Sequence, residues 1–76
     1  GKLIYAVSTI FENEGLLTLT RFLSEGKRFQ LHPLTPHCPA PLAHRIQKGA
    51  QGEYLFLHPK DAGPDYMFIA VLKRRR

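Results

Sequence analysis

Two uninterrupted hydrophobic runs stand near the two ends of the chain, at residues 3–7 and 66–72. Short runs without polar alternation are typical of strands that are covered on both faces. The second run is the longest in the chain, so we expect it to form a central strand. The first run is followed by Ser8 and Thr9 and then by acidic residues, which predicts a strand that ends where a helix begins.

A spacing of three and four residues between apolar positions predicts a helix over residues 12–25. The apolar stripe consists of Leu16, Leu19, Phe22 and Leu23. Thr9 and Glu12 have the spacing of a capping box, and Asn13 is a rival N-cap. Gly26 follows the last apolar position and is typical of the glycine that ends a helix.

The middle of the chain has weaker patterns. Residues 28–34 alternate between apolar and polar, and Pro33 limits them to a short or edge strand because proline cannot donate to a ladder. Four prolines fall in the first half of residues 33–52, which we interpret as a long surface loop with room for one helical turn within 40–48. Residues 53–58 predict a brief aromatic and aliphatic strand.

These elements predict an α/β fold in a single segment, residues 1–76. Strands at 3–7, 28–34 and 65–72 would form a three-stranded mixed sheet, with the last in the middle and antiparallel to its neighbours. The helix would cover one face and form a right-handed crossover between the first two strands. Residues 53–58 would pair as an edge strand or hairpin arm. The other face would lack a helix and expose apolar surface.

The charge of the chain is concentrated at its last residues. The formal net charge is +5, and four of the positive charges come from Lys73, Arg74, Arg75 and Arg76. Without this basic tail the body is close to neutral, so any case for nucleic acid concerns the tail alone. Two interpretations stay open: the tail contacts RNA phosphates, or it is a solvated end that frays.

Several classes of protein and site find no support in the composition. No apolar run approaches the ~20 residues that cross a bilayer, and no signal peptide is visible. The single cysteine cannot form an internal disulfide, which fits a reducing, cytoplasmic location. The candidate metal ligands lack the paired spacing of a zinc site, so we predict no metal. They are His32, His37, Cys38, His44 and His58.

Several motifs match one family in order and spacing. Residues 1–9 are Gly-x-Leu-Ile-Tyr-Ala-x-Ser-Thr, and residues 12–14 are Glu-Asn-Glu. The remaining matches are residues 21–23, 29–31, 55–59 and 63–72. Together they resemble the C-terminal end of a Rossmann-like, S-adenosylmethionine-dependent methyltransferase, and more narrowly the Sun-type RNA cytosine-5 methyltransferases, which modify ribosomal RNA. The resemblance implies a strand, a catalytic turn, an acidic helix start and a closing hairpin.

The resemblance also implies a catalytic position, which this chain fills differently. In the family a cysteine attacks C6 of cytosine and so activates C5 towards the methyl donor. A thiolate suits that step because it is intrinsically a strong nucleophile. Ser8 stands at the matching position, and no histidine is placed by the sequence to act as its base. Cys38 matches no family cysteine, and Tyr66 stands where the family usually has glycine.

The family binds S-adenosylmethionine through a glycine-containing turn after its first strand, and no Gly-x-Gly occurs here. We therefore expect the last part of a catalytic domain, incomplete by itself, that neither binds the cofactor nor catalyses alone. Its implied partners are RNA and the remainder of the domain. Two alternatives stay open: a small α/β module that binds RNA or an acidic protein, and a catalytically inactive paralogue.

Some residues have a structural interpretation beside the functional one. Ser8 and Thr9 form either a degenerate active-site turn or a strand end with capping hydroxyls, and the preference of serine and threonine for N-caps favours the second. Four aromatic residues in the predicted strands are expected in the core, although they could stack on bases. They are Tyr54, Phe56, Tyr66 and Phe68.

Overall fold

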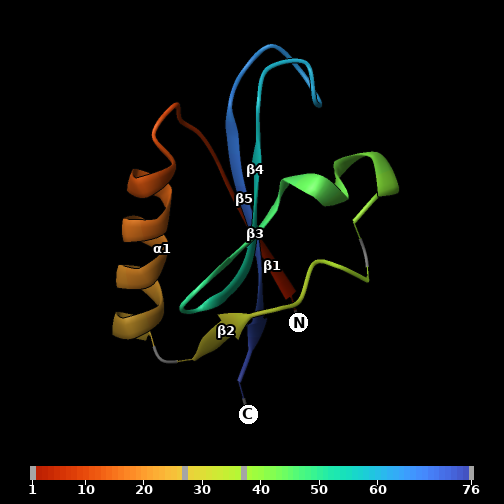
Figure 1. Ribbon diagram of the computed structural model, residues 1–76. Coiled ribbons are helices and arrows are strands. Elements are labelled where there is room, and N and C mark those ends of the chain that lie inside the picture. The colour runs from red at the N-terminus through yellow and green to blue at the C-terminus, as the bar shows by residue number, and fades with distance from the viewer. Residues whose placement is uncertain (1, 27, 37, 76) are drawn as a thin grey trace.

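The computed structural model of the chain describes residues 2–26, 28–36 and 38–75. It is a small α/β domain with one α-helix and an open sheet of five strands, all paired antiparallel (Figure 1). The elements are β1 (Lys2–Ser8), α1 (Glu12–Gly26), β2 (Phe29–Leu31), the 3₁₀ helix η1 (Ala40–Arg45), β3 (Ile46–Gly49), β4 (Gly52–Leu57) and β5 (Met67–Arg74).

Strand β5 is the centre of the sheet, as its long apolar run predicts. It pairs with β1 along one edge, and with both β4 and β2 along the other. Strands β1 and β2 are each antiparallel to β5, so they run in the same direction, and α1 connects them. The expectation of a central strand antiparallel to its neighbours is therefore confirmed. The three strands are mixed in direction, as expected, but every pair is antiparallel because β5 separates β1 from β2.

Helix α1 covers one face of the sheet and makes the main core with it (Figure 1). Phe68, Ala70 and Leu72 of β5 are fully buried there, and Leu19 of α1 packs against them with 1% of its surface exposed. Burying a side chain of the size of Phe68 stabilises the fold by about 1.5–3 kcal/mol. The aromatic residues predicted for the core lie on this face, three of them buried and Tyr66 half-buried.

Gly15 explains how α1 comes so close to the sheet. The helix begins at Glu12, as predicted, so this glycine lies in its first turn. A Cβ atom at Gly15 would lie 2.6 Å from the ring of Phe68, closer than atoms can approach. Asn13 lies inside the helix, so the alternative N-cap is wrong. The apolar stripe is narrower than predicted, since Phe22 remains 43% exposed.

The opposite face is covered by the chain between β2 and β3, which carries η1. Leu34 from this segment is buried with Leu55 and Leu57 of β4. Glu53 of β4 attaches this segment to the sheet, because its Oε1 accepts hydrogen bonds from the backbone amides of Leu34 (2.7 Å) and Thr35 (3.1 Å). These amides lower the pKa of Glu53 below its ordinary value. This face thus has a cover, but one that lacks an α-helix.

Strand β1 is an edge strand, and the expectation that it is covered on both faces is wrong. Leu3 is 46% and Ile4 70% exposed. The cause is its place at the end of the strand order, since the segment that covers the second face packs against β4 and β5. An open, mainly apolar groove of about 280 Å³ lies here, lined in part by Ile4, Leu34 and Val71. The predicted exposed apolar surface is therefore found beside β1.

Residues 33–52 contain more regular structure than one helical turn. The turn is present as η1, and β3 follows it and pairs with β4 as a hairpin. Gly49 pairs with Gly52, so only Ala50 and Gln51 lie between the strands, and Gly52 has a φ of 133° that favours glycine. Strand β4 is a hairpin arm, as expected, but it lies inside the sheet between β3 and β5.

Candidate functional site

Ser8 and Thr9 lie where β1 ends, at one end of the sheet that we call the Ser8 end. Ser8 is exposed and pairs with Met67 of β5. The backbone amide of Thr9 donates to the carbonyl of Tyr66 (3.3 Å). The side-chain Oγ1 of Thr9 accepts a hydrogen bond from the amide of Phe11 (3.1 Å). The hydroxyl of Thr9 therefore shapes the turn into α1. It accepts from the amide two residues further on, at Phe11, and not from the amide three residues further on, at Glu12, as the capping-box spacing predicts.

Glu12 is engaged with the core instead of closing a capping box. Its Oε2 accepts a hydrogen bond of 2.5 Å from the hydroxyl of Tyr54, which joins the first turn of α1 to β4. Burial raises the pKa of Tyr54 above its ordinary value of 10, and the hydrogen bond to Glu12 adds to this shift. The acidic residue that the family resemblance places beside a catalytic turn thus holds the helix on the sheet.

His58 is the histidine closest to the Ser8 end in the strand register, because Ser8, Met67 and Leu57 lie in one row across the sheet. Its ring contacts the rings of Phe56 and Tyr66 at centroid distances of 5.5 and 5.4 Å, on the face that α1 covers. Side chains alternate between faces along a strand. Since Val7 points into the α1 core, Ser8 points to the other face. His58 and Ser8 therefore lie on opposite faces of the sheet, so the imidazole is not placed to act as a base for Ser8.

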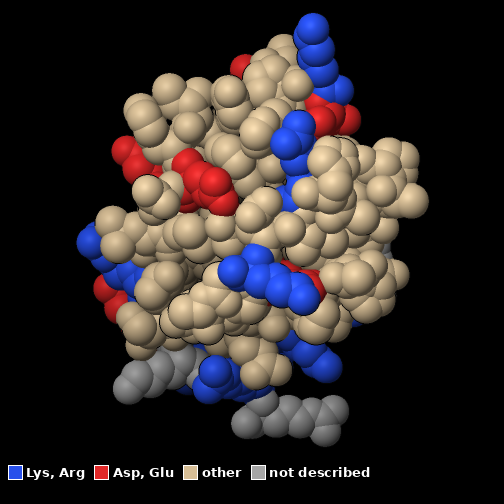
Figure 2. Space-filling model, viewed as in Figure 1, with Lys and Arg blue, Asp and Glu red and all other residues tan. Residues whose placement is uncertain are grey.

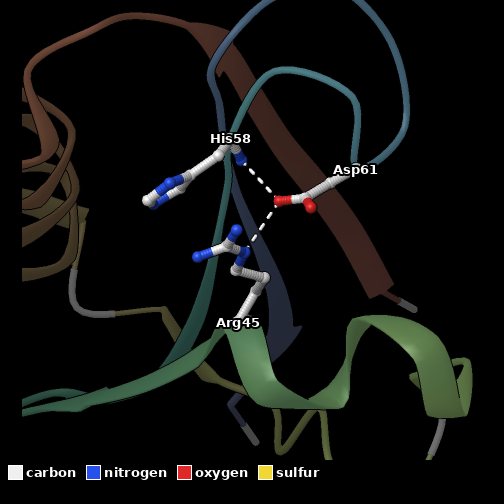
Figure 3. A network of polar contacts seen from close by, with 3 residues as sticks. All are labelled: Arg45, His58 and Asp61. Carbon is white, nitrogen blue, oxygen red and sulfur yellow. Dashed lines mark hydrogen bonds and ion pairs between the residues drawn. The ribbon is translucent and has the colours of Figure 1, made fainter.

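Asp61 completes a polar network at this end but does not pair with the imidazole of His58. Its Oδ2 accepts hydrogen bonds from the backbone amide of His58 (2.7 Å) and from Nε of Arg45 (2.8 Å). Figure 3 shows the imidazole turned away from this carboxylate. The bond from the His58 amide and the Arg45 charge lower the pKa of Asp61. The three residues therefore anchor the turn after β4 and form no catalytic triad with Ser8.

The predicted basic tail is part of the sheet. Lys73 and Arg74 belong to β5, and the backbone amide of Arg75 donates to the carbonyl of Arg28. Lys2 pairs with Lys73 across β1 and β5. The interpretation as a frayed end is wrong for residues 73–75, and Arg76 lies outside the described residues.

We call the part of the molecule that carries Lys2, Arg28, Lys73, Arg74 and Arg75 the basic end, and all five residues are exposed. Figure 2 shows blue side chains gathered there, along the lower edge of the molecule. Within the described residues, none of these five side chains has a carboxylate within 4 Å. An open groove of about 600 Å³ lies here and is lined by Gln30, Lys73, Arg74 and Arg75. Exposed, unpaired cations on a folded edge can bind a polyanion such as a phosphate backbone.

The Ser8 end and the basic end are the opposite ends of β5. Ser8 pairs with Met67 and Lys2 with Lys73, and this separation of six residues along β1 spans about 20 Å. The predicted site residues are thus not brought together. Lys2 and Arg28 were missed as members of the basic end, although the predicted antiparallel order already places the starts of β1 and β2 beside the last residues of β5.

The candidate metal ligands do not gather. Within residues 2–26, 28–36 and 38–75, no group of three or more His, Cys, Asp or Glu side chains could hold a metal ion. Cys38 is a half-buried free thiol that packs against the cluster around Leu34, and His44 is exposed on η1. His37 lies outside the described residues.

Comparison with known proteins adds no relative. No family model, curated protein or solved structure matches the chain. In the described part of the chain, no helix combines the length and apolarity that a bilayer crossing requires.

Proposed function

We propose that the chain is the C-terminal part of a Rossmann-like, S-adenosylmethionine-dependent RNA cytosine-5 methyltransferase domain of the Sun type, and that it contributes RNA contacts through its basic end. The strand order carries this proposal. Strand β5 lies between β1 and β2, antiparallel to both, and α1 connects the two outer strands. This is the order that the family resemblance implies for the closing strands of the domain.

The exposed side of β1 supports the same proposal. Its outer edge has no neighbouring strand among the described residues, and Leu3 and Ile4 are exposed beside it. An apolar surface next to an unpaired strand edge suits the packing of further sheet. Under this proposal, the remainder of the domain covers β1 and binds S-adenosylmethionine, while the present residues hold no cofactor.

The chemistry that we assign to this chain is binding and not catalysis. Ser8 occupies the position of the family cysteine, but His58 lies on the other face of the sheet and Asp61 bonds to the backbone of His58. A serine without a base is a poor nucleophile. The basic end, in contrast, presents exposed cations on a hydrogen-bonded framework. Each phosphate of single-stranded RNA that such a cation neutralises adds about 0.7 to the slope of log K against log salt.

The salt dependence of RNA affinity tests the binding part of the proposal. We expect fluorescence anisotropy with a short single-stranded RNA to show affinity that falls steeply between roughly 50 and 200 mM salt. The double variant Lys73→Gln/Arg74→Gln should lower the magnitude of the slope by about 1.4, or two phosphate contacts. The matched control Lys48→Gln/Lys60→Gln removes two exposed lysines elsewhere and should leave the slope unchanged. Equal slopes for both variants would contradict the proposal.

The methyltransferase part has its own test. The coding sequence upstream of Gly1 should encode a glycine-containing donor turn followed by an acidic residue at the end of the next strand. Isothermal titration of S-adenosylmethionine into the 76-residue chain should show no binding. Micromolar affinity of this chain for the cofactor, or an upstream frame without a donor turn, would refute it.

A second candidate is an independent α/β module that binds RNA or an acidic protein through the same basic end. The observation in its favour is the complete core beneath α1, where Phe68, Ala70 and Leu72 are fully buried without further chain. Such a module should be monomeric, melt in one sharp transition and bind no apolar dye. A segment of a larger domain should bind the dye at the exposed side of β1.

A further inference from the structure

A second groove lies beside the basic end and has a different lining. It has a volume of about 270 Å³ and is formed by the end of α1, strand β2 and the β3–β4 turn. Gln30 and Arg75 line both this groove and the 600 Å³ groove of the basic end, so the two grooves are neighbours that share part of their walls. Its other lining residues include Phe29, Ser24 and Gln51. A strand of RNA held at the basic end would therefore pass its opening.

We propose that this groove binds one unpaired nucleobase of single-stranded RNA. The inference rests on the proposed RNA contact of the basic end and specifies what that site selects. Its volume lies just below the 300–1,000 Å³ of sites for drug-sized ligands, which is adequate for a single base. A base in a duplex is stacked and paired and cannot enter such a groove without flipping out.

The lining residues match the two surfaces of a base. Phe29 offers an aromatic ring, and its contact with Phe22, at a centroid distance of 5.9 Å, continues the aromatic surface onto α1. Phe22 is 43% exposed, so part of this surface faces solvent. Bases stack on such rings without strict sequence preference. Stacking would hold the face of the base.

The polar lining residues match the edge of a base. Within the described residues, no hydrogen bond occupies the exposed side-chain amide of Gln51, which carries both a donor and an acceptor. Ser24 donates its hydroxyl to the carbonyl of Arg21 (3.2 Å), which leaves its oxygen free to accept. Arg75 lines both this groove and the 600 Å³ groove of the basic end, so its guanidinium can contact the phosphate of a nucleotide whose base is in the smaller groove.

The test compares single-stranded RNA with a duplex of the same sequence by fluorescence anisotropy. Gln51→Ala should weaken single-strand binding about three- to tenfold, the contribution of one hydrogen bond, and leave the salt slope unchanged because no phosphate contact is lost. Ser24→Ala should act in the same direction. The matched control Gln47→Ala removes an exposed glutamine of β3 outside the groove and should change neither quantity. Thermal melting checks that each variant is folded.

The outcomes separate this inference from the proposed function. A loss confined to the single strand, in both groove variants, supports the base groove. If Gln51→Ala and Gln47→Ala change the affinity equally while binding stays salt-dependent, the inference about the groove is refuted. The proposed phosphate contacts are then unaffected. An absence of any salt-dependent RNA binding by the unaltered chain overturns the proposed RNA contact, and the groove with it.

Discussion

The two ends of β5 carry polar residues that are used in opposite ways. At the Ser8 end, carboxylates and hydroxyls bond within the protein: Glu12 with Tyr54, Asp61 with Arg45, and Thr9 with the turn into α1. At the basic end, Lys73 and Arg74 point into solvent from a paired strand. A polar side chain that is hydrogen-bonded within the protein stabilises the fold. An exposed, unpaired charged side chain on a paired strand can instead bind a ligand.

The family resemblance alone would place the function at the Ser8 end, whereas the contacts of the folded chain favour the basic end. The Ser8 end matches the position of a catalytic turn, yet its groups hold α1 and the β4–β5 turn in place. The basic end has no catalytic motif, but its like charges lie side by side, with Lys2 opposite Lys73. Like charges directly opposite each other destabilise a strand pair. Under the proposed function, the phosphates of a bound RNA would neutralise these charges.

The largest effect is expected from Gly15→Ala at the Ser8 end. The added Cβ would lie 2.6 Å from the ring of Phe68, and overpacking of this kind costs about 1–3 kcal/mol. Helix propensity acts in the other direction, with alanine favoured over glycine by about 1 kcal/mol. Because the ring of Phe68 is fully buried, we expect the overpacking to outweigh this gain, and denaturant unfolding should show a net loss of up to about 2 kcal/mol. The control Thr18→Ala, on the exposed side of α1, should be neutral or stabilising. A stabilised Gly15→Ala would show that α1 does not sit this close to β5.

A smaller loss is expected from Tyr54→Phe, which removes the hydrogen bond to Glu12. The free energy of unfolding should fall by about 1 kcal/mol. The raised pKa of Tyr54 also gives a pH dependence: the stabilisation is complete below the ordinary value of 10 and is lost as the pH rises above it. The alkaline loss should be smaller in Tyr54→Phe than in the control Tyr66→Phe. Equal alkaline loss in both variants would contradict the raised pKa of Tyr54, and an unchanged free energy of unfolding at neutral pH in Tyr54→Phe would refute the role of this bond.

Acid should loosen the Ser8 end before the basic end. The pKa of Asp61 is lowered in the folded protein, so its stabilisation is complete above the ordinary value of 3.8 and is lost as the pH falls below it. The protection factor of the His58 amide against hydrogen exchange should fall there, because this amide donates to Asp61. In Asp61→Asn the exchange should already be faster at neutral pH. Exchange of the Arg75 amide, which bonds to a backbone carbonyl, serves as the internal reference and should not follow this titration.

The smallest effect is expected from Ser8→Ala. Ser8 is exposed, and within the described residues its side chain makes no hydrogen bond, so the free energy of unfolding should change by no more than about 0.5 kcal/mol. RNA affinity should also be unchanged. A tenfold loss of RNA affinity in Ser8→Ala would move the binding surface to the Ser8 end.

The sequence predicts the centre of the fold well and its margins poorly. The apolar run of β5 and the periodicity of α1 each identify an element that packs on many others. The run of β1 has the same apolar character, but only the strand order, a long-range property, decides that Ile4 is exposed. Strand β3 has a single apolar residue, Ile46, and forms because a two-residue turn brings it to β4.

The candidate site is predictable to a similar extent. The cluster of Lys73 and Arg74 is visible in the sequence, and the predicted strand directions are sufficient to add Lys2 and Arg28. The pairing of Arg45 with Asp61 and of Glu12 with Tyr54 joins residues that are far apart along the chain. No local pattern indicates these contacts, so the structural use of the Ser8 end emerges only from the folded chain.

The most direct test of the contrast between the two ends is the titration of short single-stranded RNA into the isotopically labelled chain, followed by backbone amide chemical shifts. We predict that the largest changes occur at residues 28–31 and 73–75, and that those at Ser8 and Thr9 stay within the background. Changes concentrated at Ser8, Thr9 and residues 58–66, with a silent basic end, would contradict this account.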